Sequence, residues 1–289
     1  MKIFIMTDLE GVSGVLDSVN SCNPQGRYYD NSRQLLTQEV NAAIRGFCRG
    51  GATEITVQIG HRTDSIIPEL LDERANLVSG HSDPIWPWGL DESYDALAFV
   101  GQHAKAGTAF SHLAHTGNMR TIDQRVNGIS IGEYGMLALC AMELGIPTIF
   151  ASGEEALCIE AQKLTPGVVT VATKRGLKPD DGSSAELDFE SYRLSKTAAC
   201  HFPVAKVRRM IEENAEVAAL KLREKPESFQ YPVIEFPCYM VREFRTRPED
   251  EKRPGTFAKA GYAESFIEGC NKIIYNENLP ETPLDQVIM

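Results

Sequence analysis

The fold is decided near the N-terminus, where residues 3–11 read Ile3-Phe4-Ile5-Met6-Thr7-Asp8-Leu9-Glu10-Gly11. The first four of these residues are apolar and are typical of a short buried strand. Asp8 and Glu10 follow at once and end the apolar run. Because the run is short and closes on two carboxylates, it suits neither a signal peptide nor a membrane anchor.

A helix and a second strand are expected directly after this segment. The helix is predicted over residues 32–49, with apolar residues on one face at spacings of four, three and four: Leu36, Val40, Ala43 and Phe47. Gly50-Gly51 ends it. Residues 54–59 then form a strand that closes at Gly60-His61. The order strand–helix–strand implies a parallel pair with a right-handed crossover.

Two further strands and a hairpin are predicted before residue 152. Residues 96–100 form an apolar strand followed by Gly101-Gln102-His103, and residues 147–151 form another. Between them, residues 121–126 and 129–131 flank Asn127-Gly128, which is a strong hairpin signal. A helix is predicted from Glu133 to Leu144, because Gly145-Ile146-Pro147 ends it.

The pattern changes after Thr173. Residues 174–184 contain Gly, Pro, Asp and Ser and predict a surface loop. A helix over 203–223, a strand over 233–240 and a final amphipathic helix over 262–275 are expected beyond it. We therefore predict an α/β fold, with a doubly wound, mostly parallel sheet in a metal-binding domain over residues 1–180 and a smaller α+β portion over 181–289.

Composition excludes several classes of function. The chain has 289 residues, with 40 acidic against 29 basic side chains and a formal net charge of −11, which argues against binding to nucleic acid or to an anionic membrane. No apolar run is long enough to span a bilayer. The seven cysteines are an odd number, widely spread and without CxxC, so we expect free thiols and a cytoplasmic protein.

Candidate metal ligands gather at one edge of the predicted sheet. In open α/β sheets, ligands bind beyond the carboxyl ends of the strands. Five residues follow predicted strands or open the predicted helix: Asp8, Glu10, His61, His103 and Glu133. Each of them alone is more commonly a helix cap, a solvated carboxylate or a hydrogen-bonded loop histidine. Together they form a constellation that suits a divalent cation.

The chemistry of these residue types supports a metal site. Asp8 and Glu10 lie two apart in an extended segment, so their carboxylates point the same way and repel each other unless a cation lies between them. Imidazole is the commonest nitrogen ligand for zinc. His112 and His115 form an H-x-x-H pair that could also bind metal. The sequence has no nucleotide-binding GxGxxG or GxxxxGK[ST] motif and no GxSxG nucleophile elbow.

Several segments share motifs, in the same order, with a known family. The shared segments are Thr7-Asp8-Leu9-Glu10-Gly11-Val12-Ser13-Gly14, Gly101-Gln102-His103-Ala104-Lys105-Ala106, Ala114-His115-Thr116, Asn127-Gly128 with Gly132-Glu133-Tyr134-Gly135, and residues 147–155. They resemble the DppA-type D-aminopeptidases, a family of self-compartmentalising zinc metallopeptidases. The resemblance covers residues 1–175 and resumes near 199–203 and 233–236.

That resemblance implies roles for individual residues. Asp8 would bridge two zinc ions, with Glu10 and His61 completing one site and His103 and Glu133 the other. His115 falls where the family has its catalytic histidine, either as an acid/base or as a nucleophile. Manganese or cobalt would also accept this donor set. The family further implies hydrolysis of short peptides with a free N-terminus, D-residues preferred, and a homodecamer.

Two alternatives stay open at this point. A metal-dependent amidohydrolase acting on a small non-peptide amide would use the same five ligands in a different pocket. A non-catalytic binding protein would show no metal-dependent turnover. Trp86 and Trp88 are candidates for a pocket wall, or for buried or interface positions.

Overall fold

The apolar stretch that opens the chain forms β1 (Lys2–Thr7), an inner strand of a seven-stranded sheet. The computed structural model describes residues 1–81, 83–245 and 257–287. The strand order is β3-β2-β1-β4-β7-β8-β9, parallel throughout except at β9. The other strands are β2 (Glu54–Ile59), β3 (Ala75–Val78), β4 (Ala96–Gln102), β7 (Thr148–Glu154), β8 (Val169–Gly176) and β9 (Ala199–His201).

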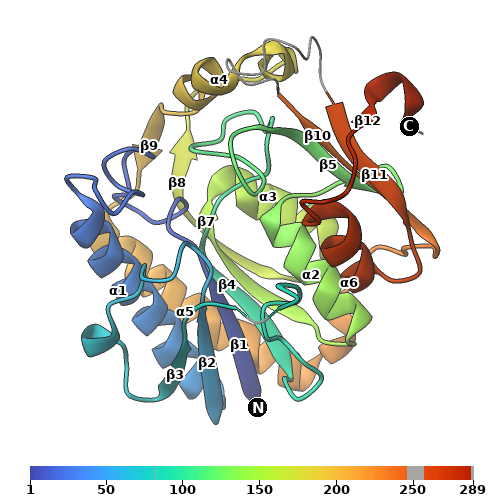
Figure 1. Cartoon of the computed structure of the whole chain (residues 1–289). Helices are drawn as coiled ribbons and strands as arrows, with labels where there is room; N and C mark the ends of the chain where they lie inside the picture. Colours follow the sequence, from blue (N-terminus) through green and yellow to red (C-terminus); the bar gives the residue numbers. More distant parts are fainter. Residues whose placement is uncertain (82, 246–256, 288–289) are drawn as a thin grey trace.

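Helices cover both faces of this sheet (Figure 1). Ile3 and Ile5 of β1 pack with α1 (Tyr29–Arg49) and α5 (Val204–Glu224) in one core. Phe4 and Met6, which point to the opposite face, pack in a second core with α2 (Glu133–Glu143), α3 (Glu155–Leu164) and α6 (Phe266–Gly269). This alternation is the period of two that a strand imposes, and it explains why a strand buried on both faces is continuously apolar.

A second sheet is antiparallel and lies beside the first, where Figure 1 shows β5, β10 and β11. Its order is β12-β11-β10-β5-β6. Its strands are β5 (Thr121–Val126), β6 (Ile129–Ser130), β10 (Cys238–Phe244), β11 (Phe257–Ala263) and β12 (Thr282–Pro283). The predicted hairpin at Asn127-Gly128 is confirmed, with φ of 46° and 79°, since a tight hairpin turn requires positive φ at both positions.

The remaining regular segments are short. They are α4 (Phe189–Ser195), a π-helical turn η4 (Cys270–Ile274), and the 3₁₀ turns η1 (Pro68–Leu70), η2 (Ser183–Glu186), η3 (Pro226–Ser228) and η5 (Leu284–Gln286). Within the described ranges, no helix is both long and apolar enough to cross a membrane.

Elements from both sides of residue 180 share each sheet. The antiparallel edge strand β9 pairs with β8 of the large sheet, and α5 packs on that sheet next to α1. Conversely, β5 and β6 pair with β10 in the small sheet. The division into residues 1–180 and 181–289 stays a prediction.

The strands and helices predicted before residue 152 are confirmed, whereas three later predictions need correction. Residues 174–176 belong to β8 instead of a surface loop, and Lys174 is fully buried there. The strand predicted over 233–240 begins only at Cys238, after Pro237, which has no N–H to donate to a ladder. The helix predicted over 262–275 begins at Phe266, because Tyr262 pairs with Tyr239 across β11 and β10.

Candidate metal centre

The candidate ligands meet at the carboxyl ends of three neighbouring strands. Asp8 and Glu10 follow β1, His61 follows β2, and His103 follows β4. Glu133 is the first residue of α2, and His115 lies in the loop between β4 and β5. The parallel arrangement therefore brings together residues that are up to 125 positions apart in the chain.

Asp8 lies at the centre of the cluster. Its Oδ1 is 3.5 Å from His61 Nδ1, and its Oδ2 is 3.3 Å from His103 Nε2. Glu10 Oε2 lies 2.9 Å from the same His61 nitrogen. The two oxygens of one buried carboxylate thus face different histidines, which is the arrangement that a bridging ligand needs.

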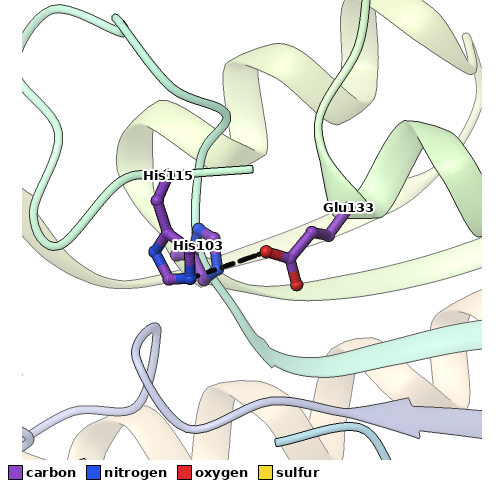
Figure 2. Close-up of side chains that lie close together, drawn as sticks. All are labelled: His103, His115 and Glu133. Carbon is purple, nitrogen blue, oxygen red and sulfur yellow. Dashed lines mark ion pairs between the residues drawn. The ribbon is translucent and has the colours of Figure 1, made fainter. Parts of the chain in front are cut away.

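Glu133 faces the other two imidazoles. Its Oε1 lies 3.5 Å from His103 Nε2 and 3.6 Å from His115 Nε2, and Figure 2 shows both rings directed toward this carboxylate. The rings of His103 and His115 are stacked, with centroids 4.0 Å apart. Gly117 N–H donates to Glu133 Oε1 at 2.7 Å and fixes the carboxylate.

Each of the three histidines in the cluster forms a hydrogen bond through one ring nitrogen to a main-chain carbonyl oxygen. A carbonyl oxygen can only accept, so the nitrogen beside it carries the proton, and in a neutral ring the opposite nitrogen presents its lone pair to the carboxylates. The three pairs are His61 Nε2 with Cys22 O at 2.9 Å, His103 Nδ1 with Ala104 O at 2.9 Å, and His115 Nδ1 with Leu113 O at 2.8 Å.

Asp8 is also held in place by donors that the sequence did not single out. Gln102 Nε2 donates to Asp8 Oδ2 at 2.8 Å, and Leu9 N–H donates to Asp8 Oδ1 at 2.8 Å. Gln102 immediately precedes His103, so β4 supplies both a candidate ligand and the residue that orients Asp8. Its position at the end of a buried strand was the available signal.

Burial and mutual charge shift the pKa of these groups strongly. Burial, aided by Glu10, raises the pKa of Asp8 to about 7. Burial alone would also raise the pKa of Glu133, but the attraction of His103 outweighs it and holds the pKa at about 2. His61 opposes burial in the same way and keeps the pKa of Glu10 well below its usual value.

Burial and the neighbouring charges also shift the pKa values of the histidines. Burial would lower the pKa of His103, but Glu133 and Asp8 raise it well above its usual value, and Glu10 does the same for His61. For His115, burial and the neighbouring His103 lower the pKa. Asp8 and Glu10, which are buried, and Glu133, which is half-buried, therefore require positive charge between them. A divalent cation could supply that charge in place of the protons on the imidazoles.

The donor set fits a metal. His103 Nε2 is buried, has no hydrogen-bond partner within the described residues, and faces carboxylate oxygens. Two groups have one potential ligand atom per residue, all within 4.8 Å of one another: Asp8, Glu10 and His103, and His103, His115 and Glu133. Imidazole nitrogen with carboxylate oxygen is a set that zinc accepts. The assignment of individual ligands stays a prediction.

The H-x-x-H pair does not act as a unit. His115 joins the cluster, whereas His112 Nε2 lies 3.2 Å from Leu16 O and its ring packs edge-on against His201. Burial lowers the pKa of His112 to about 2, so this ring is neutral.

A small cavity of about 50 Å³ opens beside the cluster. Asp8 and Glu133 line it together with Trp86, Trp88 and Tyr275. Trp86 is buried and packs against Trp88 and Tyr275, with ring centroids 6.3 and 5.4 Å apart. The two tryptophans therefore form an apolar wall next to the candidate ligands.

Comparisons with known proteins match this chain to one family over most of its length. The family model described as D-aminopeptidase matches residues 1–246. A curated D-aminopeptidase from Bacillus subtilis (strain 168) is 27% identical over 282 residues, which cover 95% of this chain and 96% of the relative. A solved structure described as the Zn-dependent D-aminopeptidase DppA from Bacillus subtilis, a self-compartmentalizing protease, superposes with a TM-score of 0.77 at 24% identity, covering 93% of each chain.

Proposed function

The chain belongs to the D-aminopeptidase family, and we propose that it hydrolyses the N-terminal peptide bond of short peptides at a site that holds two zinc ions. The observation that carries the proposal is Asp8, whose two oxygens face His61 and His103 separately. Asp8 would serve both ions, with Glu10 and His61 on one side and His103 and Glu133 on the other. Manganese or cobalt is also compatible with this donor set.

The metal site would supply Lewis-acid polarisation of the scissile carbonyl and a nucleophilic water at neutral pH. The residues of this chain would hold the metal ions and orient their ligands. Asp8 and Glu10, both buried, would provide the negative charge that holds the cations. Gln102 and Leu9 hold the Asp8 carboxylate so that both of its oxygens keep their directions.

His115 is our candidate for proton transfer. Its Nδ1 is held by Leu113 O, so Nε2 is the atom that can take up or release a proton. That nitrogen faces Glu133, which places it next to the cluster and beside the ring of His103. His115 could take a proton from the attacking water and give it to the leaving amine.

The substrate would be a short peptide with a free N-terminus. Asp8 and Glu133 line the cavity next to the cluster, and their carboxylates favour an amine or ammonium group. Trp86 and Trp88 limit the space for the first side chain, so small residues fit best. We also propose a preference for D-residues, which membership of the D-aminopeptidase family supports.

We also propose a cellular location and an oligomeric state for the enzyme. We place it in the cytoplasm, because all seven cysteines are free thiols, as a reducing compartment requires. We also propose a large homo-oligomer, a decamer by resemblance to the family. Light scattering on the purified protein measures its mass directly.

A panel of substrates tests this function. Dipeptides of D- and L-alanine, each with a free or an acetylated N-terminus, are compared with small non-peptide amides. We expect cleavage of the free D-dipeptide and loss of most activity on acetylation, since the acetyl group removes the basicity and the lone pair of the amine. Equal rates on acetylated and free peptides would contradict an aminopeptidase and favour the amidohydrolase.

A further inference from the structure

Two charged residues are completely buried beneath the candidate metal centre. Glu154 ends β7 and Lys174 lies in β8, and the two are directly opposite each other in the parallel pairing of these strands. Both side chains have zero exposed area. Burying a charge is costly unless it is compensated and hydrogen-bonded, so the contacts of these two groups indicate what they do.

Glu154 joins two segments that carry histidines of the cluster. Its Oε1 accepts a hydrogen bond of 2.9 Å from the N–H of Ala104, the residue after His103. Its Oε2 accepts a hydrogen bond from the N–H of His112, three residues before His115. One carboxylate therefore ties the end of β4 to the loop that follows it.

Lys174 holds the segment that carries the first carboxylates. Its Nζ donates to the carbonyl oxygen of Glu10 and, at 3.1 Å, to that of Val15. The neighbouring Thr173 hydroxyl donates to the carbonyl oxygen of Gly11. The end of β8 thus fixes the loop after β1 by three hydrogen bonds to main-chain oxygens.

The opposite charges of the two residues offset part of the cost of burial. Burial lowers the pKa of Lys174 to about 8, and Glu154 is the strongest influence against that shift. Burial raises the pKa of Glu154 to about 7, and Lys174 is among the groups that oppose it. Losing either residue would leave the other with a less compensated buried charge.

We propose that Glu154 and Lys174 are positioning residues of the metal centre. Glu154 sets the relative position of His103 and His115, and Lys174 sets the position of Glu10. The hydrogen bonds of both side chains described above go to main-chain atoms, so both would act through the main chain of the segments they hold. The inference rests on the proposed function, because it takes those residues as metal ligands and proton carrier.

The test uses three variants of the full chain: Glu154→Gln, Lys174→Met and the double variant. Glu155→Gln and Arg175→Met are matched controls, since each alters the next residue and, among the described contacts, neither holds a ligand segment. Zinc affinity is measured by competition with a chromophoric chelator, and thermal stability by the unfolding midpoint. The zinc measurement uses no peptide, so it does not depend on hydrolysis. A wild-type chain that binds zinc but cleaves no peptide would contradict the proposed function and leave this inference to be decided by the zinc affinities.

We expect each single variant to lose about 10–100-fold in zinc affinity, which is typical when a residue that orients ligands is removed. Each should also unfold at a lower temperature, because the remaining buried charge is less compensated. The double variant removes both charges and should recover much of the unfolding midpoint. It should not recover zinc affinity, because the glutamine amide oxygen can accept only one of the two N–H bonds that Glu154 accepts, and methionine donates nothing to the carbonyl oxygens that Lys174 holds.

This difference separates positioning from a merely structural role. If zinc affinity recovers together with stability in the double variant, the two residues only compensate each other's charge and the proposal is wrong. Unchanged zinc affinity in both single variants would also overturn it. Should a single variant fail to fold, the zinc affinity of the double variant decides alone.

Discussion

The imidazole rings of His103 and His115 lie stacked, with centroids 4.0 Å apart and planes inclined by 18°. Two positive charges at this distance would repel each other in a buried site, so the pair favours at most one protonated ring. The same contact puts His115 within reach of a metal held by His103. Substitutions must therefore first distinguish metal binding from proton transfer at these two residues.

His115→Ala should keep its metal and lose roughly 10²–10⁴-fold in turnover, the usual effect of removing a positioned acid or base. His103→Ala is the control, and it should lose metal as well as activity. Metal content by elemental analysis and turnover on the same preparations distinguish the two. Loss of metal from His115→Ala to the same extent as from His103→Ala would make His115 a ligand.

Substitution of Asp8 should lower the zinc content of the chain more than substitution of His61 does. Asp8→Ala should empty both metal positions, because its two oxygens face His61 and His103 separately. His61→Ala should mainly weaken one position. The measurement is zinc per chain after dialysis. A variant Asp8→Ala that retains as much zinc as His61→Ala would exclude a bridging role.

Trp88 should limit the size of the N-terminal side chain of the substrate. It lines the cavity of about 50 Å³ beside Asp8 and Glu133, so Trp88→Ala should enlarge this space. We expect kcat/KM for a bulky N-terminal residue to rise about 10-fold relative to alanine. Tyr262→Ala, an exposed residue on β11, is the control. An unchanged ratio would place the side chain of the substrate elsewhere.

Glu39 in α1 should make stability depend on pH. This carboxyl is buried, and burial raises its pKa to about 8 from an ordinary value of 4.5, although Ser13 N–H donates to it at 3.1 Å. Because the folded pKa is the higher one, the stabilising contribution is fully present below about pH 4.5. It is lost as pH rises through about 8.

Glu39→Gln stays neutral, so its unfolding midpoint should fall less than that of the wild type between pH 5 and pH 9. Urea unfolding at several pH values measures this, with the exposed Glu213→Gln as control. Parallel curves for wild type and Glu39→Gln would show that Glu39 does not titrate in this range.

The sequence predicted where the candidate ligands lie when they follow regular elements, although their roles as ligands stay a prediction. The strand over residues 3–6 and the helix over 32–49 have clear apolar periodicity, and the rule that parallel strands present their carboxyl ends at one edge brings Asp8, His61 and His103 together. The hairpin at Asn127-Gly128 was predictable because its turn requires positive φ at both residues.

The sequence could not predict what is held together by distant contacts. Lys174 stands in a polar stretch that is typical of a surface loop, yet it is buried because carbonyl oxygens of the loop after β1 and the charge of Glu154 accommodate it. Pairing of Tyr262 with Tyr239 overrides the helical pattern at the start of residues 262–275. Neither partner is visible within a local window of sequence.

The central claim is that a two-metal centre built on Asp8 carries the hydrolysis. The most direct test is zinc per chain, measured with peptide hydrolysis on the same sample before and after treatment with a chelator. We predict close to two divalent ions per chain, loss of hydrolysis on chelation and its return when zinc is restored. A chain that holds no metal and retains full activity in the chelator would contradict the account.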